Sequence, residues 1–428
     1  MTRCKSFVFF FLTLLVTVSL FAQTNTSANA SRAPRLQQGD WRALLQREDG
    51  QQIVFIFDLQ YKGKTPVIRI HNASERLEVK QVRQAGDSVF IEMPFFESSF
   101  RLQQQPDGSL AGNWIKGTSG KTIVMPFVAR PGKQPRFAST ARPAANLSGK
   151  WEMEFALRNG GTDTAIALLK QEGALLTGSI LTPTGDYRYL EGVVSGDTLK
   201  LSTFDGSHAY VFTALLDTDG TLRNGKFFSG PVYSQDFTAK RNEAAVLSMQ
   251  EVEMRLRGPE DRLDFRFPDL KGNPVGITDP RFRGKVVVIQ IMGSWCPNCM
   301  DETAYLSDYY RSNKNRGVEM VALAYEYSLD TARSGKALRK FQDRLRVDYP
   351  ILLTGVTAGD SLRTQKTLPQ LTNIKSFPST IFVGRDGRVK KMHGGFFGPA
   401  TGNAYTQYKK EFEETIDALL KEPVTAMQ

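Results

Sequence analysis

Two cysteines separated by two residues are the clearest chemical signature in this chain. Cys296 and Cys299 enclose Pro297 and Asn298, and the motif follows an apolar run over Val286–Met292. A Cys-x-x-Cys pair between a buried strand and the start of a helix is typical of thiol–disulfide exchange. Free N–H groups and a partial positive charge at the helix N-terminus lower the pKa of Cys296, which can then attack a disulfide as a thiolate. Cys299, one turn later, resolves the mixed disulfide.

Other uses of a cysteine pair have less support in the sequence. The chain contains three cysteines and three histidines, and no second Cys/His pair accompanies Cys296 and Cys299. A Cys-only zinc or iron–sulfur site is therefore excluded, and we predict neither a metal nor a cofactor. A structural disulfide is the remaining alternative. Proline at the first helical position fits the redox interpretation, because its missing N–H would have no partner there.

The elements around the motif predict an α/β domain. Val286–Met292 is apolar on both faces, as a central parallel strand requires. The pattern then predicts a helix over Pro297–Asn313, a strand over Val318–Tyr325, a helix over Thr331–Arg346, strands over Ile351–Leu353, Thr380–Val383 and Arg388–Met392, and a last helix with Tyr405, Tyr408, Phe412, Ile416 and Leu419 on one face. This order predicts a βαβ sheet, closed by an antiparallel hairpin and a final helix.

Four stretches of this region also match a known family, namely Gly284–Val288, Trp295–Glu302, Phe377–Val383 and Gly395–Tyr408. Through them, residues from about Phe265 to Lys421 resemble the TlpA-like (ResA-like) branch of the thioredoxin superfamily. The resemblance implies a thioredoxin fold and an oxidoreductase with a role in cell redox homeostasis. Its partners would be protein thiols and disulfides, with a membrane thiol donor that keeps it reduced.

The resemblance also implies roles for individual residues. Cys296 would be the attacking cysteine and Cys299 the resolving one, so that the two form the redox disulfide. Pro378 matches the family's cis-proline, which packs beside the disulfide and frees the backbone before it to pair with substrate. Glu302 falls on the family's active-site glutamate, which influences the cysteine pKa values; an acid on the helix surface is the alternative. The residues expected to contact substrate are Trp295, Pro297 and Phe377.

Two positions depart from the family pattern. Gln290 stands where thioredoxin has a buried acid, and an amide cannot relay a proton. Glu302 or water must therefore help to deprotonate Cys299. Met292 and Gly293 replace a frequent aromatic–Ala pair, which would loosen the wall behind the motif.

The first half of the chain consists of a repeated β-rich unit. Gly39–Trp41 recurs as Gly149–Trp151 and Gly86–Val89 as Gly196–Leu199, and each pair is 110 residues apart. Short β-branched and aromatic runs, separated by Gly-Asp and Asp-Gly turns, predict a meander barrel or sandwich in each copy. Overall the fold class is multidomain, a duplicated β-rich half followed by a thioredoxin-like α/β domain. The expected domains are 38–130, 148–241 and 263–424.

The β-rich half carries no recognisable catalytic motif. Its tryptophans could line a ligand cup, but packing in the core is the favoured interpretation for Trp41, Trp114 and Trp151. His71 and His208 lack a second ligand at metal spacing and are expected to be ordinary polar positions. An unknown ligand of this half remains a possible partner.

The N-terminus predicts export. Arg3 and Lys5 precede an apolar run over Phe7–Ala22, which together are typical of a secretory signal peptide over residues 1–22, cleaved near Ala22. An uncleaved membrane anchor is the alternative, although the run is short for a span. Cys4 precedes the run, so it cannot be a lipoprotein acceptor at the cleavage point. The expected location is extracytoplasmic, in the periplasm or envelope.

The net charge of +11 does not indicate nucleic acid as a partner. The densest basic stretch, Arg130–Lys150, is rich in Pro and Ala and is typical of a linker whose charges are solvated. The leading hypothesis is therefore an exported thiol–disulfide oxidoreductase that reduces protein disulfides. A thiol peroxidase and a binding protein that acts through the β-rich half are the alternatives.

Overall fold

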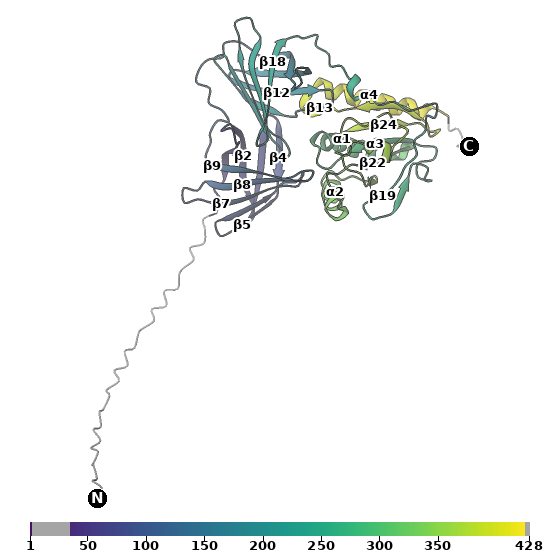
Figure 1. Ribbon diagram of the computed structural model, residues 1–428, viewed down its shortest axis with the longest axis horizontal. Helices are drawn as coiled ribbons and strands as arrows, with labels where there is room; N and C mark the ends of the chain where they lie inside the picture. Colours follow the sequence, from purple (N-terminus) through teal and green to yellow (C-terminus); the bar gives the residue numbers. More distant parts are fainter. Residues whose placement is uncertain (2–34, 424–428) are drawn as a thin grey trace. The chain divides into compact units, whose positions relative to one another are not determined.

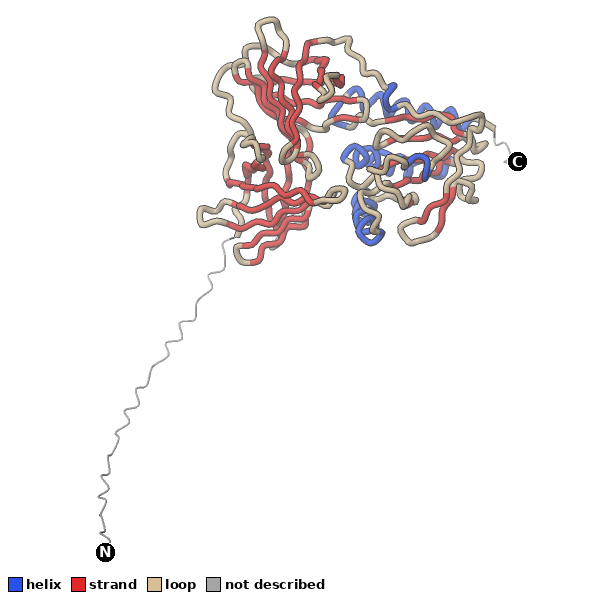
Figure 2. The backbone as a smooth tube through the Cα atoms, in the orientation of Figure 1, coloured by secondary structure: helices blue, strands red, loops and turns tan. Residues whose placement is uncertain are grey.

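The computed structural model describes Met1 and residues 35–423 (Figures 1 and 2). Apart from Met1, the predicted signal peptide over residues 1–22 lies outside the described residues. Strands are the regular elements of the first half of the described chain, and the α-helices belong to its last third (Figures 1 and 2). Within the described residues, no helix combines the length and the apolar character that a membrane span needs.

The first β-rich repeat is a nine-stranded antiparallel meander with the order β4-β3-β2-β1-β9-β8-β7-β6-β5. The first strand, β1, pairs with both β2 and the last strand, β9, so the chain returns to its start. The strands are β1 (Gly39–Gln46), β2 (Gln52–Lys62), β3 (Thr65–Asn72), β4 (Glu75–Val79), β5 (Gln81–Ala85), β6 (Ser88–Glu92), β7 (Ser98–Gln104), β8 (Leu110–Gly117) and β9 (Thr122–Pro131).

The second repeat follows the same plan and closes on itself. Strand β10 pairs with β11 and with the last strand, β18, and the additional pairing of β11 with β12 completes the ring. The strands are β10 (Gly149–Ala156), β11 (Thr162–Glu172), β12 (Leu175–Thr182), β13 (Gly185–Asp186), β14 (Leu190–Ser195), β15 (Thr198–Phe204), β16 (Ala209–Leu216), β17 (Leu222–Ser229) and β18 (Tyr233–Arg241). The fold-class prediction for this half is confirmed, as a pair of barrel-like sheets.

The interiors of both repeats are filled with side chains. Trp41, Trp114 and Trp151 are at most 1% exposed, and they pack in the cores as expected. The indole N–H of Trp41 donates to the carbonyl of Gln37, and that of Trp151 donates to the carbonyl of Leu147. A buried indole with its one donor satisfied is a structural residue, so these tryptophans do not line a ligand cup.

The expectation of a solvated linker over Arg130–Lys150 is wrong at Arg136. This side chain is 5% exposed, and its guanidinium lies 3.3 Å from the carboxylate of Glu191. It also donates to the backbone carbonyl of His71 and to the hydroxyl of Ser202. Arg136 thus joins the two repeats, because a guanidinium with five donors can satisfy several acceptors at one buried point.

The C-terminal region is built on a five-stranded sheet of order β23-β22-β21-β24-β25. Strand β21 (Val286–Met292) lies at its centre, parallel to β22 (Val318–Ala324) and antiparallel to β24 (Ser379–Val383). The remaining elements are β19 (Arg266–Pro268), β20 (Pro274–Gly276), α1 (Pro297–Asn313), α2 (Thr331–Leu345), β23 (Ile351–Leu353), α3 (Arg363–Thr367), β25 (Val389–Gly394) and α4 (Asn403–Lys421), with short 3-10 turns at η1 (Gln250–Val252), η2 (Lys314–Arg316) and η3 (Pro399–Thr401).

This topology confirms the predicted thioredoxin-like α/β domain. All seven residues of β21 are buried, as expected for a central strand with both faces covered. Helix α3 and strands β19 and β20 were not predicted, and β25 runs to Gly394, two residues beyond the predicted Met392. The extension matters because it carries the chain to the loop at Gly395 beside the cysteine motif.

Candidate active site

The cysteine pair lies at the junction of β21 and α1. Cys296 is the N-cap of α1, in an extended conformation, and Pro297 is the first helical residue. The two cysteines are joined by a disulfide, and the Sγ of Cys296 accepts the N–H of Cys299 at 3.1 Å. Cys296 is 4% exposed and Cys299 is fully buried. In the reduced form the same N–H and the helix dipole stabilise a thiolate on Cys296.

The loop before β24 faces the disulfide. The bond between Phe377 and Pro378 is cis, as predicted. The carbonyl oxygen of Phe377 lies 3.4 Å from the Sγ of Cys296, while that of Pro378 accepts the N–H of Gly395 at 3.0 Å. Phe377 is therefore in direct contact with the redox motif from a different part of the chain, and Pro378 contacts the loop at Gly395.

Trp295 directly precedes Cys296. It is partly buried, its indole N–H donates to the carbonyl of Tyr325 at 2.8 Å, and its ring stacks on Tyr327 with centroids 4.6 Å apart. A Cβ at Gly293 would collide with this indole ring, so the ring can occupy this position only because residue 293 is a glycine. Gly293 therefore does not loosen the wall behind the motif. Pro297, also expected to touch substrate, is buried here.

Glu302 is fully buried, which excludes the alternative of an acid on the helix surface. Its carboxylate accepts hydrogen bonds from Gln290 at 2.7 Å and from the hydroxyls of Thr380 and Tyr408, each at 2.8 Å. Burial raises the pKa of Glu302, and the three hydrogen bonds oppose that rise. Gln290, which takes the place of a buried acid, thus holds Glu302 one turn from Cys299.

The structure also reveals a second buried acid that the sequence analysis missed. Glu326 follows β22 and accepts the N–H of Ser294 at 2.7 Å and the hydroxyl of Ser294 at 2.6 Å. Burial raises the pKa of Glu326 to about 7. Its position just after a buried strand was a signal in the sequence, because loops at the carboxyl ends of parallel strands carry functional groups.

The second β-rich repeat reaches the motif as well, within the unit Arg35–Gln428. Arg188 forms an ion pair with Asp301, and the Oδ2 of Asp186 accepts the N–H of Gly398 at 2.6 Å. The hydroxyl of Ser207 lies 3.4 Å from the carbonyl of Trp295. Residues of the β-rich half therefore contact the segments on both sides of the cysteines, which no local pattern in the sequence predicted.

His, Cys, Asp and Glu side chains form no cluster suited to a metal ion among the described residues. His71 lies 2.8 Å from a carboxylate oxygen of Asp58, and His208 lies 3.2 Å from Asp205. Each of these histidines thus contacts one acid, and the two acids are different residues.

Comparisons with known proteins cover this region of the chain. Residues 259–407 match the Redoxin family model. The thiol-disulfide oxidoreductase ResA of Geobacillus kaustophilus is 27% identical over 36% of this chain and 74% of its own length. ResA of Halalkalibacterium halodurans is 27% identical over 37% of this chain and 77% of its own length. A solved structure of a putative thiol:disulfide interchange protein DsbE from Chlorobium tepidum is 23% identical, covers 39% of this chain and 99% of its own, and has a TM-score of 0.30.

The family model matches residues 259–407, which follow the two β-rich repeats in the chain. Residues 259–407 thus match the Redoxin family and are similar to proteins named thiol-disulfide oxidoreductases, and they contain the disulfide between Cys296 and Cys299.

Proposed function

We propose that the chain is an exported thiol–disulfide oxidoreductase that reduces disulfides of proteins through Cys296 and Cys299. The observation that carries the proposal is the position of Cys296, which caps α1 and receives the N–H of Cys299 while its Sγ faces the carbonyl of Phe377. A sulfur at this point is stabilised as a thiolate and lies beside a backbone acceptor that can orient a bound substrate.

The reaction follows from this geometry in two steps. The thiolate of Cys296 attacks one sulfur of the substrate disulfide, a mixed disulfide forms, and the other substrate sulfur leaves as a thiolate. Cys299 then loses its proton and attacks the Sγ of Cys296, which releases the second substrate thiol and leaves the Cys296–Cys299 disulfide. Two electrons pass to the substrate, and a thiol donor must return them to the protein. We expect this donor to be a membrane protein.

Glu302 is our candidate for the group that takes the proton of Cys299. It lies three residues later on α1, and residues at this spacing are neighbours on one helix face. Its buried carboxylate keeps hydrogen bonds from Gln290, Thr380 and Tyr408 that would hold it in place while it gains a proton. Trp295, Phe377 and Pro378 are the residues that we expect to contact the substrate.

A turbidimetric assay with insulin and dithiothreitol tests the proposal. The wild type is expected to accelerate reduction of the insulin disulfides, and Cys296→Ser is expected to abolish the acceleration. Cys299→Ser is expected to accumulate a mixed disulfide, which non-reducing electrophoresis and mass spectrometry detect. If the wild type reduces insulin no faster than dithiothreitol alone, the proposal fails. Consumption of hydrogen peroxide without insulin reduction would instead indicate a thiol peroxidase.

Export is tested separately. When the full chain is expressed in a bacterium with two membranes, we expect it in the periplasmic fraction, with a mass that lacks residues 1–22. Arg3→Glu combined with Lys5→Glu removes the basic n-region and is expected to retain the precursor in the cytoplasm. Recovery of an unprocessed chain in the membrane fraction would support the anchor instead.

A further inference from the structure

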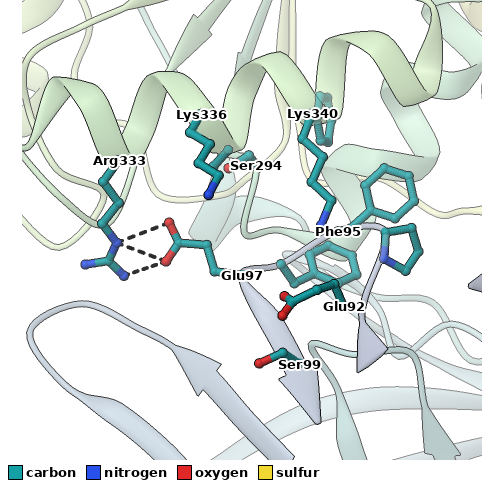
Figure 3. Close-up of a pocket in the computed structure, with 12 residues that line it drawn as sticks. Glu92, Phe95, Glu97, Ser99, Ser294, Arg333, Lys336 and Lys340 are labelled. Carbon is teal, nitrogen blue, oxygen red and sulfur yellow. Dashed lines mark hydrogen bonds and ion pairs between the residues drawn. The ribbon is translucent and has the colours of Figure 1, made fainter. Parts of the chain in front are cut away.

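A cavity of about 330 Å³ lies between the first β-rich repeat and helix α2. Half of its lining comes from the turn between β6 and β7, over Glu92–Ser99, and most of the other half comes from Arg333–Phe341 of α2. Figure 3 shows Arg333, Lys336 and Lys340 extending from one face of α2 toward this turn. Neither half of the chain forms the cavity alone.

The walls of the cavity are aromatic. Phe95, Phe96 and Phe341 line it and are at most 7% exposed, and the rings of Phe95 and Phe341 meet edge to face with centroids 6.2 Å apart. These contacts fix the turn of the first repeat against α2. A space of this size with rigid apolar walls suits one aromatic or branched aliphatic group.

The charges around the cavity leave two ammonium groups without an acid partner. The two acids are taken by arginines, since Glu97 pairs with Arg333 at 2.6 Å and Glu92 pairs with Arg101 at 2.8 Å. Lys340 donates to the backbone carbonyl of Met93, and burial lowers its pKa. Lys336 is exposed and forms no hydrogen bond or ion pair within the part of the chain that the structure describes. An anion entering the cavity would find these two cations beside the aromatic walls.

The cavity lies next to the redox motif. Ser294, which lines it, is two residues before Cys296, and two residues span at most about 7 Å between Cα atoms. A substrate bonded through sulfur to Cys296 would therefore bring a neighbouring chemical group into the cavity.

Resting on the proposed function, we infer that this cavity is a specificity pocket for the substrate disulfide. The pocket takes an aromatic or branched aliphatic group that bears a carboxylate and is attached close to the reacting sulfur. The walls of Phe95 and Phe341 receive the apolar part, and Lys336 and Lys340 pair with the carboxylate. The inference gives the first β-rich repeat a role in the reaction, since it supplies one wall of the pocket.

Two small aromatic disulfides test the charge preference. The probe 5,5′-dithiobis(2-nitrobenzoate) carries an aromatic carboxylate on each half, whereas 4,4′-dithiodipyridine is neutral. Each oxidises the reduced protein by the same balanced reaction, in which one probe molecule yields two aromatic thiols and the protein gains the Cys296–Cys299 disulfide. Stopped-flow absorbance measures both rates for the pre-reduced wild type and variants.

Lys336→Glu is expected to lower the rate with the carboxylate probe about tenfold, because a like charge then faces the carboxylate. The rate with the neutral probe is expected to change by less than about twofold. Arg339→Glu is the matched control, because it makes the same charge change on the exposed face of α2, outside the cavity lining. It is expected to change both rates by less than about twofold. Equal effects of the two variants on the carboxylate probe would overturn the inference.

A second pair of probes distinguishes the source of the carboxylate. Oxidised Gly-Cys-Phe is prepared with a free C-terminal carboxylate and with an amide. If Lys336→Glu selectively slows the free acid, the pocket serves polypeptide substrates; if it slows only the aromatic reagent, the pocket serves low-molecular-weight disulfides. If Lys336→Glu does not slow the carboxylate-bearing probe more than its neutral counterpart in either pair, the inference is overturned. The proposed function fails on a different result, namely a wild type that reacts with none of the four probes or a Cys296→Ser variant that reacts as fast.

Discussion

Arg188 of the second β-rich repeat holds Asp301 of helix α1 by two parallel hydrogen bonds, from Nε to Oδ2 at 2.8 Å and from Nη2 to Oδ1 at 3.1 Å. Asp301 is two residues after Cys299, so this pair ties the repeat to the first turn of the redox helix. The same guanidinium also pairs with Glu75 at 2.6 Å and with Asp205 at 2.8 Å. One arginine thus neutralises acids from both repeats and from the redox domain.

Replacement of Arg188 by methionine is expected to lower the free energy of unfolding by about 3–5 kcal/mol, because it leaves buried carboxylates without their shared cation. Burial already raises the pKa values of Glu75 and Asp301, so both acids would take up protons more readily in the variant. The loss is therefore expected to be smaller at pH 5 than at pH 8. Urea unfolding followed by circular dichroism measures it.

Arg223→Met is the matched control for this prediction. Arg223 pairs with Asp219 at 2.5 Å, but the two side chains are 55% and 47% exposed. Water screens an exposed pair of this kind, so the control is expected to lose far less stability than Arg188→Met. If the two variants lose the same stability, Arg188 does not act as the buried centre of a network.

Glu302→Gln is expected to slow the resolution of the mixed disulfide by about 10²-fold, the usual contribution of a positioned base. Because burial raises the pKa of Glu302, the wild-type rate should rise with pH at values above the ordinary carboxyl range near 4.3, as the carboxylate forms. The variant should lack this rise. Quenched-flow mass spectrometry of the mixed disulfide between pH 5 and 8 checks both effects.

Glu413→Gln serves as the control, because Glu413 accepts a hydrogen bond from Tyr305 at the exposed surface of α4. Its rate and pH profile should match those of the wild type. An unchanged profile in Glu302→Gln would show that water, and not this carboxylate, accepts the proton of Cys299.

Local patterns in the sequence were sufficient for the redox motif. The apolar run before Cys296, the proline after it and the alternation of strands and helices are all short-range signals, and the structure places them as expected. The repeat in the β-rich half could be predicted for the same reason, because its turns and strands recur at a constant distance along the sequence.

The contacts made by Arg136, Arg188 and Glu326 could not be predicted from the sequence. Each depends on partners that are distant in sequence, such as Glu191 for Arg136 and Asp301 for Arg188. A lone arginine between strands has the same local pattern whether it is solvated or buried. The burial is decided by the packing of the repeats and the redox domain, which composition and periodicity do not encode.

Gly293→Ala is expected to displace Trp295, because the added Cβ would occupy the space of the indole ring. The variant loses the hydrogen bond to the carbonyl of Tyr325, and overpacking of this kind costs about 1–3 kcal/mol. Iodide quenching of tryptophan fluorescence reports the change, since the other three tryptophans are at most 1% exposed. We expect a higher KM for insulin with a smaller change in kcat.

Gly359→Ala is the control for this substitution. Gly359 is exposed, and an added Cβ would meet no atom closer than 4.0 Å. It should leave quenching and kinetics unchanged. Equal quenching in wild type and Gly293→Ala would contradict the steric role assigned to Gly293.

Glu326→Gln is expected to change how stability depends on pH. In the wild type, burial raises the pKa of Glu326 to about 7, whereas an unfolded glutamate titrates near 4.3. Between these values the unfolded chain releases a proton that the folded protein retains, so this group lowers stability as the pH rises. The loss is nearly complete by pH 8 and amounts to at most about 4 kcal/mol. A glutamine does not titrate, although its amide can still accept from the N–H of Ser294 and donate to its hydroxyl.

The variant should therefore match the wild type at pH 4 and be more stable than it at pH 8. Urea unfolding of the oxidised protein at pH 4, 6 and 8 measures the difference, and Glu414→Gln at an exposed position of α4 should leave it near zero throughout. A difference between Glu326→Gln and wild type that stays constant over this range would mean that Glu326 has the same pKa in the folded and the unfolded chain, and that it is ionised in the folded protein at pH 6 and 8. The carboxylate would then serve as a fixed acceptor for Ser294, and the turn before Cys296 would carry a permanent negative charge that disfavours the thiolate.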